Sequence, residues 1–483
     1  MTFKFQVDTN HTTKDEYDYG DNQSYTKRRV TVDNKYFTNI QVKDVKPMLT
    51  DDCVLYIDCD TIPFMAASLQ DDNYIEVSHP EWSDVQEFKN KTEFKGASRT
   101  EGVINQNSWL GIENMKRVAT GKPEYVLPDF TITQKKRLKF EESKCLKNIQ
   151  EYIDEFIDSI KFQADCSNVF CYLGSGDNHR HLLKLPQIYK GNRNDQERPL
   201  LLKQAREYVL NNYPSELIVG RESDDKVQQA GFEGWLHYKK TGKFNKFISL
   251  VDKDGYQAPC LLFSYNKNGP IWAHPNPVLI NSTNEGVGEI EMVGNDCKCA
   301  GLLQICYQLC VGDSSDGYSP YLKFDKSMHP EKPYSDASFF KDFFPLKTPQ
   351  ECLQKVVDKF YDFFPKGLKY KAWDGTDMHI DTLGWLSMLF TCVYMLRSEN
   401  DTTNIKMLLD KFNADYTKIT NNHIRKLKGH PEVDEAVAEY KSVVDKVVGL
   451  LSDNSGKAAD KVARKDEALE LLKQIGEFDK LYQ

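Results

Sequence analysis

The sequence Gly220-Arg221-Glu222-Ser223-Asp224-Asp225 opens a stretch that closes with Val251-Asp252-Lys253-Asp254. Between these two acidic groups lie a helix-like segment and a short apolar run, Phe247 to Val251, which is typical of a buried strand. Five carboxylates therefore stand at the start of one predicted helix and at the end of one predicted strand. Carboxylates that are brought together raise one another's pKa unless a cation neutralises them, so this pattern favours a cation site.

Two further apolar runs predict buried strands, Cys53 to Ile57 and Val169 to Leu173. Apolar residues at helical spacing predict helices over Cys145 to Ile160 and about Pro199 to Asn211. Strands that alternate with helices are typical of a mainly parallel sheet with crossover helices. The sequence therefore predicts an α/β fold.

Acidic residues follow each of the predicted strands. Asp58 follows the first, Asp177 follows the second, and Asp252 and Asp254 follow the third. Because sites in parallel sheets form at the carboxyl ends of the strands, we expect these side chains to converge. A helix predicted over about Lys298 to Cys310 leads to two more acids, Asp313 and Asp316. Hard oxygen ligands suit Mg²⁺ or Mn²⁺, and such a cluster is typical of a two-metal phosphoryl-transfer site.

Length and composition narrow the class of protein. The chain has 483 residues, which predicts one large core with extensions or a second domain. Its net charge of -9 does not indicate a nucleic-acid partner. Local basic patches, however, matter more for nucleic-acid binding than the total charge. Twelve cysteines without a secretory signal favour free thiols in a reducing compartment. The longest apolar stretch, Leu383 to Leu396, is too short to span a bilayer, so we expect a cytoplasmic protein with no membrane partner.

The pattern of segments predicts the organisation of the chain. Residues 1–52 are a polar extension with candidate edge strands, and residues 53–318 form the α/β core. An insertion rich in polar and basic residues interrupts this core at about 71–140. Residues 319–400 are predicted to be helical, and residues 401–483 form a charged helical extension.

The stretch Phe88 to Gly96 within the insertion interleaves lysines with aromatic residues. Such a pattern can follow a phosphate backbone, and our hypothesis is that Lys89, Lys91 and Lys95 steer a single strand. The alternative is a solvated face, which is the commoner outcome for any single cluster of this kind.

Five short motifs occur in a fixed order across residues 53–318: Asp58-Cys59-Asp60, Tyr189-Lys190-Gly191-Asn192-Arg193, Glu222-Ser223-Asp224-Asp225, Asp252-Lys253-Asp254 and Gly312-Asp313-Ser314-Ser315-Asp316-Gly317. Each alone is weak, but the order resembles the 5′ nuclease superfamily. That family comprises flap endonucleases, the 5′-nuclease domains of bacterial DNA polymerases, and tailed-phage 5′→3′ exonucleases. The resemblance implies a PIN-like core, with a central, mainly parallel sheet flanked by helices.

The resemblance also implies the roles of individual residues. Two divalent ions, Mg²⁺ or Mn²⁺, would be held directly or through water. The implied ligands of the first ion are Asp58, Asp177, Glu222, Asp224 and Asp225, and those of the second are Asp252, Asp254, Asp313 and Asp316. The alternative for Asp224 and Asp225 is helix capping.

The basic motif has implied roles of its own. Lys190 and Arg193 would contact the scissile phosphate, with the alternative of a solvated turn. Tyr189 would stack on the terminal base, with the alternative of a half-buried tyrosine.

The chain departs from the family pattern in several places. Cys59 stands at the family's glycine, and Ser223 stands at its alanine. Relatives usually carry a glycine-rich helix-hairpin-helix that grips duplex DNA, and Tyr318 to Lys332 lacks those glycines. The segment Tyr334 to Lys341 is the candidate for its degenerate second half.

We therefore expect a metal-dependent 5′→3′ exonuclease or flap endonuclease that hydrolyses DNA phosphodiester bonds in phage replication or recombination, in the host cytoplasm. Its expected substrates are a DNA duplex with a 5′ end and a 5′ flap. Three alternatives stay open. The same site could remove the RNA strand of RNA–DNA hybrids. The chain could bind branched nucleic acid without cleaving it. The C-terminal helices could recruit a polymerase or a single-strand-binding protein.

Overall fold

The computed structural model describes residues 28–30, 37–39, 42–97, 104–176, 178–193, 197–250, 252–264, 276–280, 286–321 and 334–424, with isolated positions between 446 and 471. The chain divides into two compact units. The first is formed by Met1–Asp58, Phe162–Gln196 and Leu217–Gln483, and the second by Cys59–Lys161 and Glu197–Glu216. Among the described residues, no helix is both long and apolar enough to cross a membrane.

A seven-stranded sheet forms the centre of the first unit, in the order β2-β11-β10-β9-β3-β7-β8. Its strands are β2 (Phe37–Asn39), β11 (Asn276–Ile280), β10 (Cys260–Ser264), β9 (Phe244–Ser249), β3 (Leu49–Asp58), β7 (Val169–Gly174) and β8 (Ser215–Ile218). Strand β3 pairs in parallel with β7 and β9, and β9 pairs in parallel with β10. Strands β11 and β2 add an antiparallel edge. The predicted α/β fold with a mainly parallel sheet is confirmed.

Helix α7 (Ser223–Thr241) packs against β9 and β10. Val227 and Ala230 of the helix meet Ile248 and Leu262 of the sheet in one buried cluster. The helix approaches the sheet so closely that a Cβ atom on Gly234 would overlap the carbonyl oxygen of Lys246. This packing fixes the start of α7 at the carboxyl edge of the sheet.

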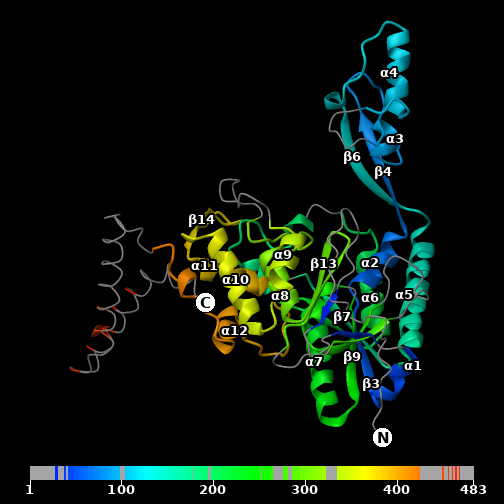
Figure 1. Ribbon diagram of the computed structural model, residues 1–483. Helices are drawn as coiled ribbons and strands as arrows, with labels where there is room; N and C mark the ends of the chain where they lie inside the picture. The colour runs from blue at the N-terminus through cyan, green and yellow to red at the C-terminus, as the bar shows by residue number, and fades with distance from the viewer. Residues whose placement is uncertain are drawn as a thin grey trace. The chain divides into compact units, whose positions relative to one another are not determined.

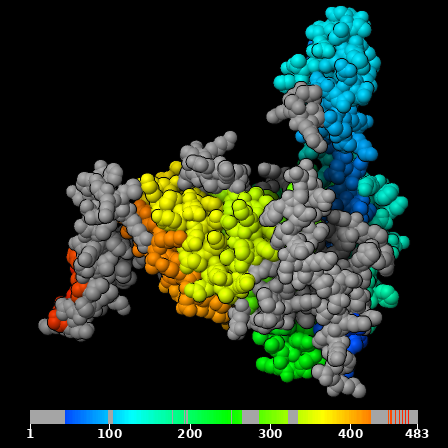
Figure 2. Space-filling model, in the orientation of Figure 1, coloured from blue at the N-terminus to red at the C-terminus, as the bar shows by residue number. Residues whose placement is uncertain are grey.

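A helical region shares the largest buried core of the first unit. Its helices are α8 (Leu302–Cys310), α9 (Asp336–Phe343), α10 (Pro349–Phe363), α11 (Thr382–Val393) and α12 (Ile405–Lys411). Strands β14 (Leu368–Lys371) and β15 (Asp377–Ile380) form a hairpin between α10 and α11. Figure 2 shows residues 334–424 as one continuous yellow-to-orange surface.

One predicted helix begins later than expected. Residues Asp296–Ala300 form strand β13, which pairs with β12 (Glu289–Val293), and β1 (Arg28–Val30) pairs with the other side of β12. Cys297 and Cys299 alternate with exposed residues and point into the core, as a strand requires. Gly301, with a φ of 70°, ends this strand and lets α8 begin at Leu302 rather than Lys298.

The second unit contains the segment predicted as an insertion. Strands β5 (Gln86–Phe88), β4 (Asp71–Ser78) and β6 (Thr131–Leu138) form an antiparallel sheet in that order. Helix α3 (Lys91–Lys95) contacts β5 and helix α4 (Trp109–Ala119), and α3 lies beside the sheet in Figure 1. Phe88, Phe94, Tyr125 and Phe130 belong to an aromatic core shared by these elements. This segment is therefore a folded subdomain and not an open loop.

The remaining helices are α1 (Val42–Val45), α2 (Thr61–Ser68), α5 (Glu142–Ala164) and α6 (Leu202–Asn212). In the second unit, α2 packs against α6, and Arg206 pairs with Asp60 at 2.5 Å. All twelve cysteines of the chain are buried, and none forms a disulfide.

The close packing of α7 gives a stability prediction. Gly234→Ala should lower the free energy of unfolding by about 1–3 kcal/mol, because its methyl group meets rigid backbone. Gly231→Ala is the matched control, since the atoms nearest its methyl group would be side-chain atoms, with Ile248 Cδ1 at 2.9 Å and Cys260 Cβ at 3.0 Å. Urea unfolding of both variants checks the prediction. Equal stability losses at the two glycines would contradict it.

Candidate active site

Predicted acids from the end of β3, the start of α7 and the turn after β9 interact electrostatically. Asp58, the last residue of β3, lies level with the ends of β7 and β9 and accepts a hydrogen bond from Ser223 Oγ at 3.1 Å. Burial raises the pKa of Asp224 well above its usual range, and the neighbouring Asp58, Glu222 and Asp252 raise it further. These acids therefore lie close enough to interact electrostatically.

The turn after β9 carries a second pair of acids. Asp252 precedes a short 3-10 helix, Lys253–Tyr256, and its Oδ1 accepts a weak hydrogen bond from the backbone N–H of Asp254 at 3.4 Å. Burial raises the pKa of Asp254 to about 8, and the nearby Asp252, Asp316 and Asp313 contribute to this rise. Gln308 of α8 opposes the rise by donating a hydrogen bond to Asp254 Oδ1 at 2.5 Å.

Asp313 and Asp316 lie in a tight turn after α8. Asp313 and Tyr318 exchange both backbone hydrogen bonds, at 2.8 and 3.0 Å, which closes the turn. Asp313 accepts from Ser315 Oγ and pairs with Lys253 Nζ at 2.9 Å. Although burial opposes it, these contacts hold the pKa of Asp313 below its usual range.

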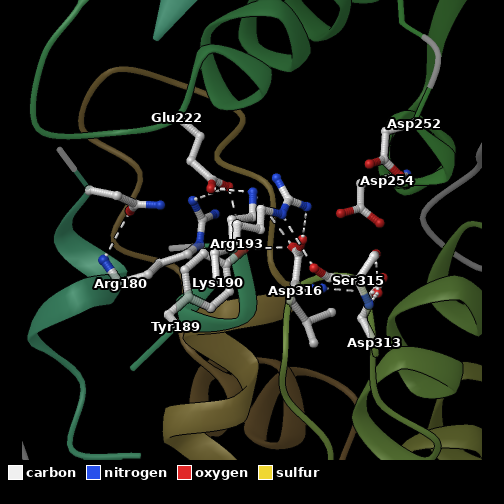
Figure 3. Close-up of polar contacts among 12 residues, drawn as sticks. Arg180, Tyr189, Lys190, Arg193, Glu222, Asp252, Asp254, Asp313, Ser315 and Asp316 are labelled. Atoms are coloured by element: carbon white, nitrogen blue, oxygen red, sulfur yellow. Dashed lines mark hydrogen bonds and ion pairs between the residues drawn. The ribbon is translucent and has the colours of Figure 1, made fainter. Parts of the chain in front are cut away.

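Lys190 links two groups of acids. The first group lies at the end of β3 and the start of α7, and the second lies in the turns after β9 and α8. Its Nζ lies 2.5 Å from Glu222 Oε1 and 3.6 Å from Asp316 Oδ2. Although burial opposes it, both acids raise the pKa of Lys190, so the ammonium stays charged. Arg193 binds Asp316 Oδ1 at 2.7 Å from a half-exposed position. Figure 3 shows Lys190, Arg193 and Asp316 between Glu222 on one side and Asp252 and Asp254 on the other.

Tyr189 is buried, with only 2% of its surface exposed. Its ring stacks on Tyr318, and its hydroxyl donates to Asp316 Oδ2 at 2.8 Å. The predicted stacking on a terminal base conflicts with this placement, because no face of the ring is open to a base. Here Tyr189 orients Asp316.

Sequence reasoning missed Arg180. This arginine is 1% exposed and forms two hydrogen bonds to the carboxylate of Asp225, at 2.9 and 3.0 Å, and a third to Glu222 Oε2 at 3.1 Å. Both oxygens of Asp225 are therefore engaged, which favours a structural role for this acid over the predicted metal ligation. The only sequence signal was a basic turn, Asn178-His179-Arg180-His181, next to Asp177.

Four predicted site residues cannot be added to this cluster. Asp177 lies outside the described residues. Lys89, Lys91 and Lys95 lie in the second unit, the first just before α3 and the other two at its first and last positions.

The chemistry of the donors fits a hard divalent cation, but the described residues do not by themselves preform a coordination shell. Among the described residues, no three His, Cys, Asp or Glu side chains form a ready-made metal-binding group. The described carboxylates are Asp58, Glu222, Asp224, Asp225, Asp252, Asp254, Asp313 and Asp316, and the cations that pair with them are Arg180, Lys190, Arg193 and Lys253. Acids thus outnumber cations two to one, and a divalent ion would relieve the excess.

Comparisons with known proteins give structural likenesses at low sequence identity. No protein-family model matches the chain, and no curated protein sequence matches it. A crystal structure of the T5 D15 protein co-crystallised with metal ions has 13% identity and a TM-score of 0.31, covering 58% of this chain and 94% of that one. The T5 5′-exonuclease with bound zinc has 12% identity and a TM-score of 0.27, covering 67% of this chain and 91% of that one. A mutant of the T5 5′-exonuclease has 11% identity and a TM-score of 0.25, covering 67% and 92%. Likeness at this level carries no conclusion about activity.

The burial of Arg180 predicts its cost of removal. Arg180→Met leaves Asp225 buried without its cation and should cost about 3–5 kcal/mol of stability. Arg193→Met removes a half-exposed arginine that also pairs with an acid, and should cost less than about 1 kcal/mol. Denaturant unfolding measures both. A similar loss in the two variants would show that Arg180 does not hold the site together.

Proposed function

We propose that this chain is a metal-dependent nuclease of the 5′ nuclease type, which hydrolyses phosphodiester bonds from a 5′ end. One observation carries the proposal. Acids from the end of β3, the start of α7, the end of β9 and the turn after α8 gather around Lys190 and Arg193. Oxygen donors beside fixed cations are suited to phosphoryl transfer.

Each acid has a role in this proposal. Asp58, Glu222 and Asp224 would hold one Mg²⁺ or Mn²⁺, with Asp177, which follows β7 in the sequence, as a further proposed ligand. Asp252, Asp254, Asp313 and Asp316 hold the other ion. When bound, the ions polarise the attacking water and neutralise charge on the scissile phosphate. Asp225 is reassigned, because Arg180 already occupies both of its oxygens.

The basic residues act on the phosphate. Lys190 and Arg193 pair with Glu222 and Asp316. Lys190 and Arg193 would be free to bind phosphate oxygens once Glu222 and Asp316 serve as metal ligands. Arg193 suits this exchange, because about half of its side chain is exposed. Tyr189 keeps Asp316 oriented while its partners change.

The substrate follows from the order of the motifs. A DNA duplex with a 5′ end or a 5′ flap is the proposed substrate, in phage replication or recombination, and the RNA strand of an RNA–DNA hybrid is the second candidate. The crowding of acids supports catalysis over simple binding, because carboxylates without cations would repel an anionic strand.

Cleavage assays test the proposal. The wild type should release nucleotides from a 5′-labelled duplex, a flap or a hybrid in Mg²⁺ and not in EDTA. Asp254→Asn and Lys190→Met should each lower the rate at least about a hundredfold, since each removes a charge that faces the phosphate or its metal. Asp362→Asn is the control, because that acid is exposed and lies on α10.

The outcome separates the candidate functions. The substrate that is cleaved fastest, whether the duplex, the flap or the hybrid, identifies the reaction that the protein performs. Absence of cleavage with any metal, combined with tight binding to the flap, would replace the nuclease with a non-catalytic binding protein.

Recruitment of a polymerase or single-strand-binding protein needs a careful truncation. Ile405 and Leu409 of α12 are fully buried, so a cut at residue 404 would open the core. Removal of residues 425–483 should leave cleavage of naked DNA unchanged while weakening partner binding in a pull-down. A loss of naked-DNA cleavage would contradict a recruitment role.

The lysines of the second unit have a separate test. If Lys89, Lys91 and Lys95 steer a single strand, replacing all three with Gln should weaken binding to single-stranded DNA. The slope of the logarithm of the binding constant against the logarithm of salt concentration should become shallower, by an amount that corresponds to the loss of up to about three phosphate contacts. Lys135 and Arg137 are not used, because Glu76, Asp72 and Glu87 already pair with them. An unchanged salt slope would assign the three lysines to a solvated face.

A further inference from the structure

The carboxyl end of α11 leaves backbone groups that its own helix cannot satisfy, as every helix end does. Val393, Tyr394 and Met395 are nearly fully buried, so water cannot take these hydrogen bonds. Two polar side chains from the candidate site take them instead. They are Arg180 and Gln257, each 1% exposed.

Arg180 ties this helix end to the first group of acids. Its Nε donates to the carbonyl oxygen of Thr391 and its Nη2 to that of Tyr394, both at 3.0 Å. The same guanidinium binds Glu222 and Asp225, and Asp225 also accepts from the backbone N–H of Leu396 at 3.1 Å.

Gln257 ties the same helix end to the second group of acids. Its Oε1 accepts from the backbone N–H of Met395 at 3.2 Å, and its Nε2 donates to the carbonyl oxygen of Val393 at 2.8 Å. That Nε2 also donates to Gln308 Oε1 at 2.8 Å, and Gln308 Nε2 donates to Asp254 Oδ1.

The backbone groups at the end of α11 determine how the side-chain amides of Gln257 and Gln308 are oriented. A backbone N–H can only donate and a carbonyl can only accept, so Gln257 must present its oxygen to Met395 and its amide nitrogen to Val393. Gln308 must then turn its oxygen toward Gln257 and its NH₂ group toward Asp254. A flipped Gln308 would place its oxygen against a carboxylate, which is repulsive.

We propose that Gln308 is a positioning residue for Asp254, held through Gln257 by the end of α11, and that residues Thr391–Leu396 thereby anchor both groups of candidate metal ligands. This inference rests on the proposed function. The sequence suggested only a duplex-binding role for the helical region. In this inference, the helical region also positions the candidate metal ligands. Residues that orient metal ligands typically change metal affinity about 10–100-fold when they are replaced.

The test measures metal binding without nucleic acid. Mn²⁺ is titrated into the full chain and free Mn²⁺ is followed by electron paramagnetic resonance, with thermal unfolding recorded for each variant. Gln308→Leu should raise the Mn²⁺ dissociation constant about tenfold or more. Gln257→Glu should raise it in the same direction without touching Asp254, because a carboxylate cannot donate to Gln308 or to Val393.

Gln304→Leu is the matched control. Gln304 is 2% exposed on the same helix, one turn earlier, and its Nε2 makes no hydrogen bond among the described residues. Its replacement should leave the Mn²⁺ dissociation constant within about twofold of the wild type. If Gln308→Leu does not fold, Gln257→Glu carries the comparison.

The outcomes separate the two proposals. A wild type that binds no Mn²⁺ would overturn the proposed metal-dependent function. A wild type that binds Mn²⁺, with Gln308→Leu and Gln257→Glu binding it equally well, would overturn the positioning role alone. An equal weakening in Gln304→Leu would also overturn it, because the effect would then come from packing.

Discussion

Repulsion among buried carboxylates is the constraint on which this site depends. Burial and neighbouring acids raise the pKa of both Asp224 and Asp254, so neither group would ionise readily on its own. Three cations offset this repulsion. Lys190 lies between the two groups and pairs with Glu222, Arg180 pairs with Glu222 in the first group, and Lys253 pairs with Asp313 in the second. It also places Asp224 and Asp225 in the first turn of α7, where the helix dipole favours negative charge. These elements together hold acids from four separate segments at one edge of the sheet.

The acids at strand ends could be predicted because their signal is local. An apolar run followed at once by Asp58 or Asp252 identifies both a buried strand and its carboxyl end. The order of the strands then brings the ends together by a general property of parallel sheets. Arg180 could not be found in this way, because it lies 42 and 45 residues from its partners Glu222 and Asp225. Only the tertiary structure identifies the pairing.

Two other features could not be predicted from local sequence alone. The predicted insertion was recognised by its polar and basic residues, but the sequence did not show that two of them, Lys135 and Arg137 of β6, pair with acids on neighbouring strands. The helix predicted from Lys298 begins later, because Cys297 and Cys299 are apolar enough to serve either a helix or a strand. In both cases the partners across a sheet decide the outcome, and those partners are distant in sequence.

The burial of all twelve cysteines makes their reactivity a measure of how readily the structure around them opens. A thiol reagent can reach a sulfur only when the surrounding structure parts, so its reaction rate follows the local opening equilibrium. Cys59 and Cys145 lie in the second unit, whereas Cys306 and Cys392 lie in the core of the first. The order in which these thiols become modified would therefore reveal which unit opens first, without any engineered label.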